Sequence, residues 1–158
     1  MEKMPEHQLR GDCNPLNGAT PWHGCLFCKS GREYEVVQRF NSLYPEARGI
    51  APVKAHYKRG GGEAMEEDVL LLSGYVFFES RVDLSVRELL RTENVYRLLT
   101  YNDGDWRLHG NDERFAAMLF DSNGRIGLSK AYFDEGDRIR ILDGFMKEYE
   151  GYIVRVNK

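Results

Sequence analysis

The chain has 158 residues, and its 22 basic and 25 acidic side chains give a net charge of −3, so no protein-wide field attracts nucleic acid. A hydrophobic fraction of 42%, with 8 Phe, 9 Tyr and 2 Trp, supplies a packed core and excludes global disorder. No apolar run is long enough to span a bilayer, and the N-terminal stretch lacks the apolar segment of a secretory signal. We therefore expect a cytoplasmic protein with no membrane contact.

The first elements follow a stretch rich in proline and glycine. Residues 1–21 show no apolar period, which predicts a flexible leader. The run WHGCLFC, residues 22–28, is short and aromatic and predicts a strand. Ser30 and Glu33 have the spacing of a capping box, in which each side chain bonds a free backbone N–H at a helix start. A helix is therefore expected over residues 31–43.

Two extended segments, residues 50–58 and 69–79, come next. Three consecutive glycines at 60–62 separate them, together with an acidic patch made of Glu63, Glu66, Glu67 and Asp68. Because glycines favour a turn, this pattern predicts a long antiparallel hairpin with a charged tip.

The following region predicts helix, strand and helix. Ser85 and Glu88 repeat the capping-box spacing and begin a short helix that ends near Thr92. Residues 95–101 form the next strand, and a third helix begins at Asn111 or Asp112. The order is that of an α+β, ferredoxin-like antiparallel sheet with helices packed on one face.

The run VLLLSGYVFF, residues 69–78, is apolar on both sides if it forms one strand, because successive side chains point to opposite faces. Helices on one side leave the second face to be covered by another part of the chain or by a partner. Both alternatives stay open from the residues alone.

Five segments follow one another along the chain: Trp22, the run Ser30-Gly31-Arg32-Glu33, LLLSGYVFFES, LLRTENVYRLL and GDRIRILDGFMKEYEGYIVRV. In this order they resemble the NusG family of transcription factors. The resemblance implies a leader (1–21), an NGN domain (22–121), a linker (122–133) and a partial KOW module, the first strands of a small SH3-like barrel (134–158). Leu72-Ser73-Gly74-Tyr75 replaces the family's usual Phe-Pro-Gly-Tyr, which favours a specialised paralogue similar to the LoaP-type antiterminators.

The resemblance implies an elongation or antitermination factor that is not an enzyme and uses no cofactor. Such a factor binds the clamp helices of the RNA polymerase β′ subunit through an apolar depression on the sheet, and it suppresses pausing or termination. By position, the RNA polymerase-binding residues are Trp22, Phe27, Leu71, Leu72, Tyr75 and Phe77. Plain core packing is the alternative for each of them.

Local basic side chains are the candidates for nucleic-acid contact. Between residues 29 and 60 there are seven basic and three acidic side chains, and the family contacts non-template DNA near this side. The candidates here are Lys54, Lys58 and Arg59. A solvated surface is the alternative explanation.

In the KOW segment, Ile139 and Ile141 predict a strand, Asp143-Gly144 a turn, and residues 152–156 a returning strand. Its candidates for contact with leader RNA are Arg138, Arg140 and Lys147. The family uses this module to bind the terminator protein Rho or a small-subunit ribosomal protein. The resemblance implies that only part of the module precedes Lys158.

Other motifs predict no chemistry. Cys25 and Cys28 match C-x-x-C, but a strand directs the two sulfurs to opposite faces and no second pair follows, so no metal site is expected. We expect the histidines to lack a carboxylate partner within a helix, so no catalytic residue is predicted for His7, His23, His56 or His109. The alternative function is a stand-alone RNA-binding module built on a ferredoxin-like sheet.

Overall fold

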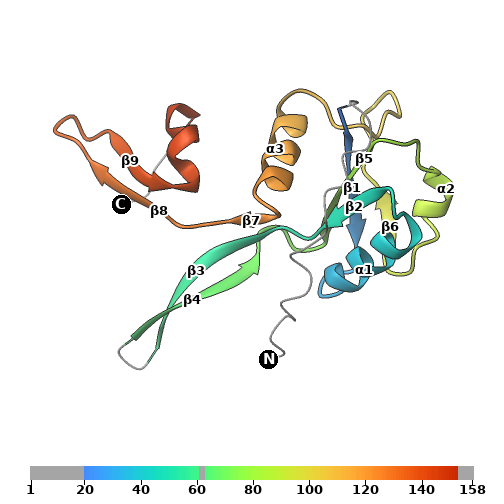
Figure 1. Cartoon of the computed structure of the whole chain (residues 1–158), viewed down its shortest axis with the longest axis horizontal. Helices are drawn as coiled ribbons and strands as arrows, with labels where there is room; N and C mark the ends of the chain where they lie inside the picture. Colours follow the sequence, from blue (N-terminus) through green and yellow to red (C-terminus); the bar gives the residue numbers. More distant parts are fainter. Residues whose placement is uncertain (1–19, 61–62, 153–158) are drawn as a thin grey trace.

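The computed structural model describes residues 20–60 and 63–152 (Figure 1), so most of the predicted leader and residues 153–158 lie outside the described part. In chain order the elements are β1 (Trp22–Cys28), α1 (Glu33–Leu43), β2 (Ala47–Ile50), β3 (Val53–Gly60), β4 (Glu63–Leu70), β5 (Tyr75–Ser80), α2 (Val86–Leu89), β6 (Val95–Leu98), α3 (Gly110–Asp121), β7 (Arg125–Ile126), β8 (Ser129–Phe133), β9 (Ile139–Gly144) and the 3₁₀ helix η2 (Phe145–Tyr152). The protein is therefore α+β, and the part that the structure describes has three α-helices beside its sheets.

The main sheet has four strands in the order β2-β5-β1-β6, and all neighbouring strands are antiparallel. The central pair has Gly24 of β1 opposite Phe78 of β5. A Cβ atom at Gly24 would lie 2.3 Å from Cζ of Phe78, so only glycine leaves room for this ring. This contact fixes β1 against β5 and explains the glycine inside an otherwise apolar strand.

Helices cover both faces of this sheet, not one. On the first face, Phe40 of α1 and Leu89 of α2 pack against Val76 and Phe78. On the second face, α3 packs against Phe77, which points the other way from its neighbours along β5. The prediction of helices on a single face is wrong, because both sets of β5 side chains are apolar and the chain's own α3 covers part of the second set.

The predicted hairpin exists, but its strands are β3 and β4, and it projects from the main sheet (Figure 1). The acidic patch lies in β4 instead of at a tip, and the turn at residues 71–74 separates β4 from β5. Opposite charges stabilise this arrangement. Arg125 of β7 binds Glu66 and Asp68, and β7 pairs with β3 at the base of the hairpin.

The segment predicted as a linker, residues 122–133, contains β7 and β8. β8 pairs with β9, and Ala131 lies opposite the buried Ile141. Asp134 shapes the connecting turn by accepting hydrogen bonds from the backbone N–H groups of Gly136 and Arg138. The strand partner of β9 therefore precedes it in the chain. Tyr152 ends η2, and the rest of the predicted returning strand lies outside the described residues.

The two cysteines of the C-x-x-C motif are on opposite faces of β1, as predicted. Cys25 lies in the core beneath α3, and Cys28 lies in the core beneath α1 and α2. Burial raises the pKa of the Cys25 thiol to about 12 and that of Cys28 to about 11. Cys13 lies outside the described residues.

The substitution Leu119→Ala tests whether α3 contributes to the core. Leu119 is fully buried on α3, so the change should lower the free energy of unfolding by about 2–5 kcal/mol. The matched control is Leu142→Ala in β9, where the side chain is 57% exposed and the expected change is within about 0.5 kcal/mol. Urea denaturation measures both values, and equal effects would contradict the packing of α3 on the sheet.

Candidate protein-docking surface

α3 leaves part of the second face open, and aromatic rings lie there. The rings of Phe27 and Tyr75 have centroids 5.4 Å apart, and those of Phe27 and Tyr96 are 5.9 Å apart. Tyr96 is 61% exposed, while Phe27 and Tyr75 are half-buried. We call Phe27, Tyr75, Tyr96 and Arg97 the aromatic patch. It joins side chains from β1, β5 and the edge strand β6.

A β-bulge in β6 produces this grouping. Phe27 pairs with Arg97 and Cys28 pairs with Val95, so Tyr96 is the extra residue of the strand. A bulge re-aims side chains that regular alternation would send to opposite faces. As a result both consecutive residues reach the same ring, and the guanidinium carbon of Arg97 lies 5.3 Å from the centroid of Phe27.

The turn before β5, residues 71–74, packs closely against Phe27 of the patch. Gly74 has a φ of 83°, and a Cβ there would lie 3.2 Å from Cε2 of Phe27. The carboxylate of Glu33, which is 1% exposed, accepts hydrogen bonds from the backbone N–H of Gly74 at 2.7 Å and from the hydroxyl of Ser73 at 3.3 Å. These bonds connect α1 to the turn that carries Tyr75.

The capping box predicted from Glu33 is therefore wrong. Arg32 occupies the N-cap position of α1 and makes no side-chain capping bond. The physical reason is that Glu33 serves a buried N–H group of a distant turn, where an unpaired donor is more costly than at a solvent-exposed helix end. The predicted short helix after Ser85 is confirmed, but it ends at Leu89 and not near Thr92. The backbone N–H groups of Glu88 and Leu89 bond the carbonyl of Ser85.

The structure brings together only some of the residues predicted to bind polymerase. Phe27 and Tyr75 belong to the aromatic patch. Leu71 is partly buried against the core beneath α3, while Leu72 in the same turn is 38% exposed.

Two of the predicted residues lie outside the patch. Phe77 is buried and contacts Phe115 of α3, with ring centroids 5.9 Å apart. Trp22 is on the first face by strand alternation, and the guanidinium of Arg107 covers its ring at 4.1 Å. The patch residues that sequence reasoning missed are Tyr96 and Arg97, and alternation gave no signal for them because a bulge brings them to Phe27.

The hairpin formed by β3 and β4 is less basic than its first strand suggests. Residues 53–70 carry three basic and four acidic side chains. Lys54 is exposed, Lys58 lies 4.0 Å from Glu67, and the side chain of Arg59 lies outside the described part of the structure. The local positive charge predicted from residues 29–60 is therefore offset on the hairpin by β4.

We call β8, β9 and η2 together the β8–β9 unit. In it Arg138 and Lys147 are exposed, whereas Arg140 is ion-paired within the protein. Arg140 forms ion pairs with Asp134 at 3.1 Å and with Glu150 at 3.0 Å. The hydrogen bonds to Glu150 and Asp134 raise the pKa of the Arg140 guanidinium. Arg140 therefore helps to hold η2 against β9 and is less available to an RNA phosphate than its two neighbours.

A buried histidine is a further feature that sequence spacing missed. His23 is 3% exposed, and its Nδ1 lies 2.9 Å from Oε1 of Glu113 on α3. Its Nε2 lies 3.7 Å from Oε2 of Glu79 on β5. The expectation that the histidines lack a carboxylate partner is wrong. It overlooked His109, which precedes Glu113 by four residues, and it covered only pairs within one helix. Here the partners come from two other elements, 56 and 90 positions along the chain.

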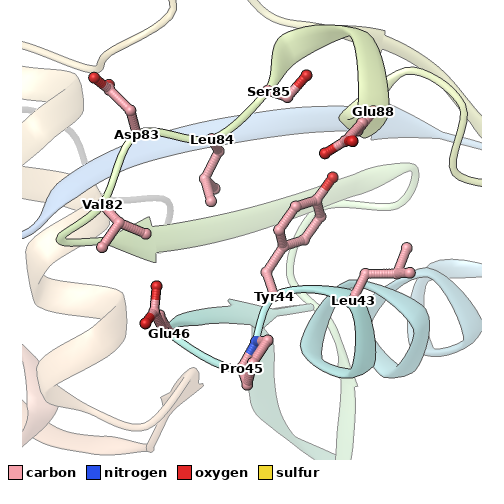
Figure 2. A pocket seen from close by; sticks show the side chains of 9 residues that line it. All are labelled: Leu43, Tyr44, Pro45, Glu46, Val82, Asp83, Leu84, Ser85 and Glu88. Atoms are coloured by element: carbon pink, nitrogen blue, oxygen red, sulfur yellow. The ribbon is translucent and has the colours of Figure 1, made fainter.

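A recess of about 350 Å³ lies on the first face, between the end of α1 and the loop before α2 (Figure 2). The carboxylates of Glu46, Asp83 and Glu88 line it, and Figure 2 shows the hydroxyl of Tyr44 directed toward Glu88. Burial and then the charge of Glu88 raise the pKa of Tyr44. Asp83 already binds Arg107 at 2.7 Å. The recess is thus acidic and separate from the aromatic patch.

No protein-family model matches this chain, and the comparison with curated proteins finds no match. Among residues 20–60 and 63–152, no helix is long and apolar enough to cross a membrane. The same part of the chain contains no group of three or more His, Cys, Asp or Glu side chains arranged to hold a metal ion.

The buried carboxylate of Glu33 provides a second test. Glu33→Ala leaves the buried N–H of Gly74 without its acceptor, which should lower the free energy of unfolding by about 1–3 kcal/mol. Glu35→Ala, two residues away, removes only a surface ion pair with Arg32, so its effect should stay below about 1 kcal/mol. Hydrogen exchange at the Gly74 amide should accelerate in the first variant alone. An unchanged Gly74 exchange rate would show that Glu33 does not hold the turn.

Proposed function

We propose that this protein is a transcription elongation or antitermination factor of the NusG type, and that its aromatic patch binds the clamp helices of the RNA polymerase β′ subunit. The observation that carries the proposal is that α3 covers only part of the second face of the sheet. In the part left open, the rings of Phe27, Tyr75 and Tyr96 lie together and are partly exposed. Leu72 adds an exposed aliphatic side chain in the turn next to Tyr75.

The physical basis is docking of helices on a small apolar surface. In such interfaces a few aromatic and aliphatic anchors contribute most of the binding free energy. Phe27 and Tyr75 are held by the core and by the Gly74 turn, so little conformational entropy is lost when a partner covers them. A bound factor of this kind bridges the polymerase cleft, favours the closed, elongating clamp and reduces pausing, without a covalent step.

The finer division of the chain belongs to the same proposal. We assign residues 22–121 to an NGN domain and the β8–β9 unit to the start of a KOW module. The element order of β1 to α3 supports the first assignment, although the β3–β4 hairpin adds two strands to the expected order. The Leu72-Ser73-Gly74-Tyr75 variation supports a specialised, LoaP-like paralogue.

The structure changes which basic residues are the better candidates for nucleic acid. Arg138 and Lys147 are exposed on the β8–β9 unit and remain our candidates for leader RNA. The proposed contact of the hairpin with non-template DNA has less support, because β4 is acidic. Rho or a small-subunit ribosomal protein would use the same C-terminal unit.

A second candidate function has one specific observation in its favour. Rings from three strands beside Arg97 also form a platform on which unstacked RNA bases can lie. A stand-alone RNA-binding module would bind single-stranded RNA without polymerase, and its affinity would fall steeply with salt. Polymerase dependence therefore separates the two functions.

Tyr75→Glu tests the docking site directly. A buried charge at the centre of an apolar interface should reduce capture by the β′ clamp helices at least about tenfold, since each such anchor contributes on the order of 2 kcal/mol. Leu72→Glu should act in the same direction. A pull-down on immobilised clamp helices measures the loss, and circular dichroism checks that the fold is retained.

The control is Tyr57→Glu on the β3–β4 hairpin, where the tyrosine is 56% exposed and belongs to another sheet than the patch. This variant should bind like the wild type. Full binding by both Tyr75→Glu and Leu72→Glu would contradict the polymerase proposal, and salt-sensitive RNA binding lost in Tyr75→Glu would favour the second function. Single-round transcription through a pause and a terminator then reports the direction of the regulatory effect.

A further inference from the structure

A continuous chain of polar contacts joins α3 to the sheet at both ends of the helix. In the first turn of α3, Glu113 contacts His23 of β1. His23 lies beside Glu79 of β5, and Glu79 lies 4.0 Å from Arg48 of β2. Arg48 then bonds the side chain of Asn123, just beyond the other end of α3, at 3.0 Å.

Apolar contacts lie between α3 and the sheet, beside these polar contacts. Phe120 of α3 packs against His23, and the centroids of the two rings are 5.3 Å apart. The guanidinium carbon of Arg48 lies 5.6 Å from the centroid of the Phe120 ring. Cys25 and Phe77 lie beneath α3, on the opposite face of the sheet from the core under α1 and α2. α3 is thus attached to the sheet by polar contacts at both of its ends, and between them it covers apolar side chains that adjoin the aromatic patch.

His23 is the titratable centre of these contacts. The charged groups that face it are Glu79 from β5 and Glu113 from α3, and Arg48 from β2 reaches it only through Glu79. From β1 itself the nearby group is the Cys25 thiol, which burial keeps neutral. The 3.7 Å separation from Glu79 is too long for a hydrogen bond, so the directional contact of the imidazole is the one to α3.

We propose that α3 is a reversible cover of the sheet's second face, and that loss of the proton from His23 loosens its attachment. The protonated imidazole attracts both carboxylates, and one of them moves away with α3 when the cover opens. The neutral imidazole keeps at most one hydrogen bond to Glu113 and loses the charge attraction. Opening would expose Cys25 and Phe77 next to Phe27 and enlarge the apolar surface available to a partner. The device itself does not depend on what that partner is.

The direction of the pH effect follows from the surroundings of the imidazole. Burial lowers the pKa of His23, but Glu79 and Glu113 outweigh burial and leave the pKa above its ordinary value of 6.5. The attachment of α3 is therefore strongest below pH 6.5 and weakens as the pH rises through the raised pKa. Release of a single proton changes the opening equilibrium by at most about tenfold per pH unit in this window.

The two buried cysteines provide an internal measurement of this opening. Cys25 lies under α3, whereas Cys28 lies on the opposite face under α1 and α2. In the full chain carrying Cys13→Ser, both thiols are labelled with iodoacetamide from pH 6 to pH 9. Their rates rise together with thiolate formation in the opened states, so the ratio of Cys25 to Cys28 labelling isolates the movement of α3.

We expect this ratio to increase severalfold as the pH rises through the window, and Glu113→Gln and His23→Gln to flatten the increase. Asp121→Asn, at an exposed carboxylate on the same helix, should behave like the wild type. A ratio independent of pH in the wild-type background, or a slope unchanged by Glu113→Gln, would overturn the proposal. If circular dichroism shows that His23→Gln does not fold, the comparison of Glu113→Gln with Asp121→Asn decides. No polymerase is present, so the outcome is separate from that of the pull-down.

Discussion

The structure depends on one constraint, which is that β5 is apolar on both of its faces. Val76 and Phe78 pack against α1 and α2, and Phe77 points to the other side of the sheet. A strand of this kind is stable in water only when both faces are covered. On the first face the chain packs α1 and α2 against the sheet, and on the second face α3 covers part of it. The remaining apolar surface is the aromatic patch.

This partial cover connects the fold to the proposed function. A fully covered second face would leave no docking site, and a fully open one would expose an apolar area that favours aggregation. α3 reduces the exposed part to a few rings, of which Phe27 is fixed by Gly74 and by the bulge in β6. The contacts of His23 make the extent of that cover sensitive to protonation. The same helix therefore limits the surface and, in our proposal, regulates it.

Local signals in the sequence predicted much of the fold, and non-local contacts account for the errors. Apolar period identified β1, α1, α2 and α3, and strand alternation correctly separated Cys25 from Cys28. Glu33 was misread because its partner, Gly74, is 41 positions away and no spacing rule connects them. The apolar run 69–78 looked like one strand because Leu71 and Leu72 continue the apolar pattern into the turn at 71–74, where Ser73-Gly74 is the turn signal. Of the patch residues, Phe27 and Tyr75 were predicted from the resemblance. Tyr96 and Arg97 were missed because a β-bulge, which the sequence does not reveal, brings both to Phe27. Trp22 was included by position, although strand alternation places it on the first face.

The most direct test of the central claim is site-specific crosslinking from the open part of the second face. A photoreactive phenylalanine derivative replaces Tyr96, which is exposed at the edge of the patch, and the protein is irradiated with intact RNA polymerase. We predict a crosslink to the β′ clamp helices, together with a much weaker one when the same group replaces Tyr132 on β8. Crosslinks from position 132 alone, or none to β′ from position 96, would contradict the account.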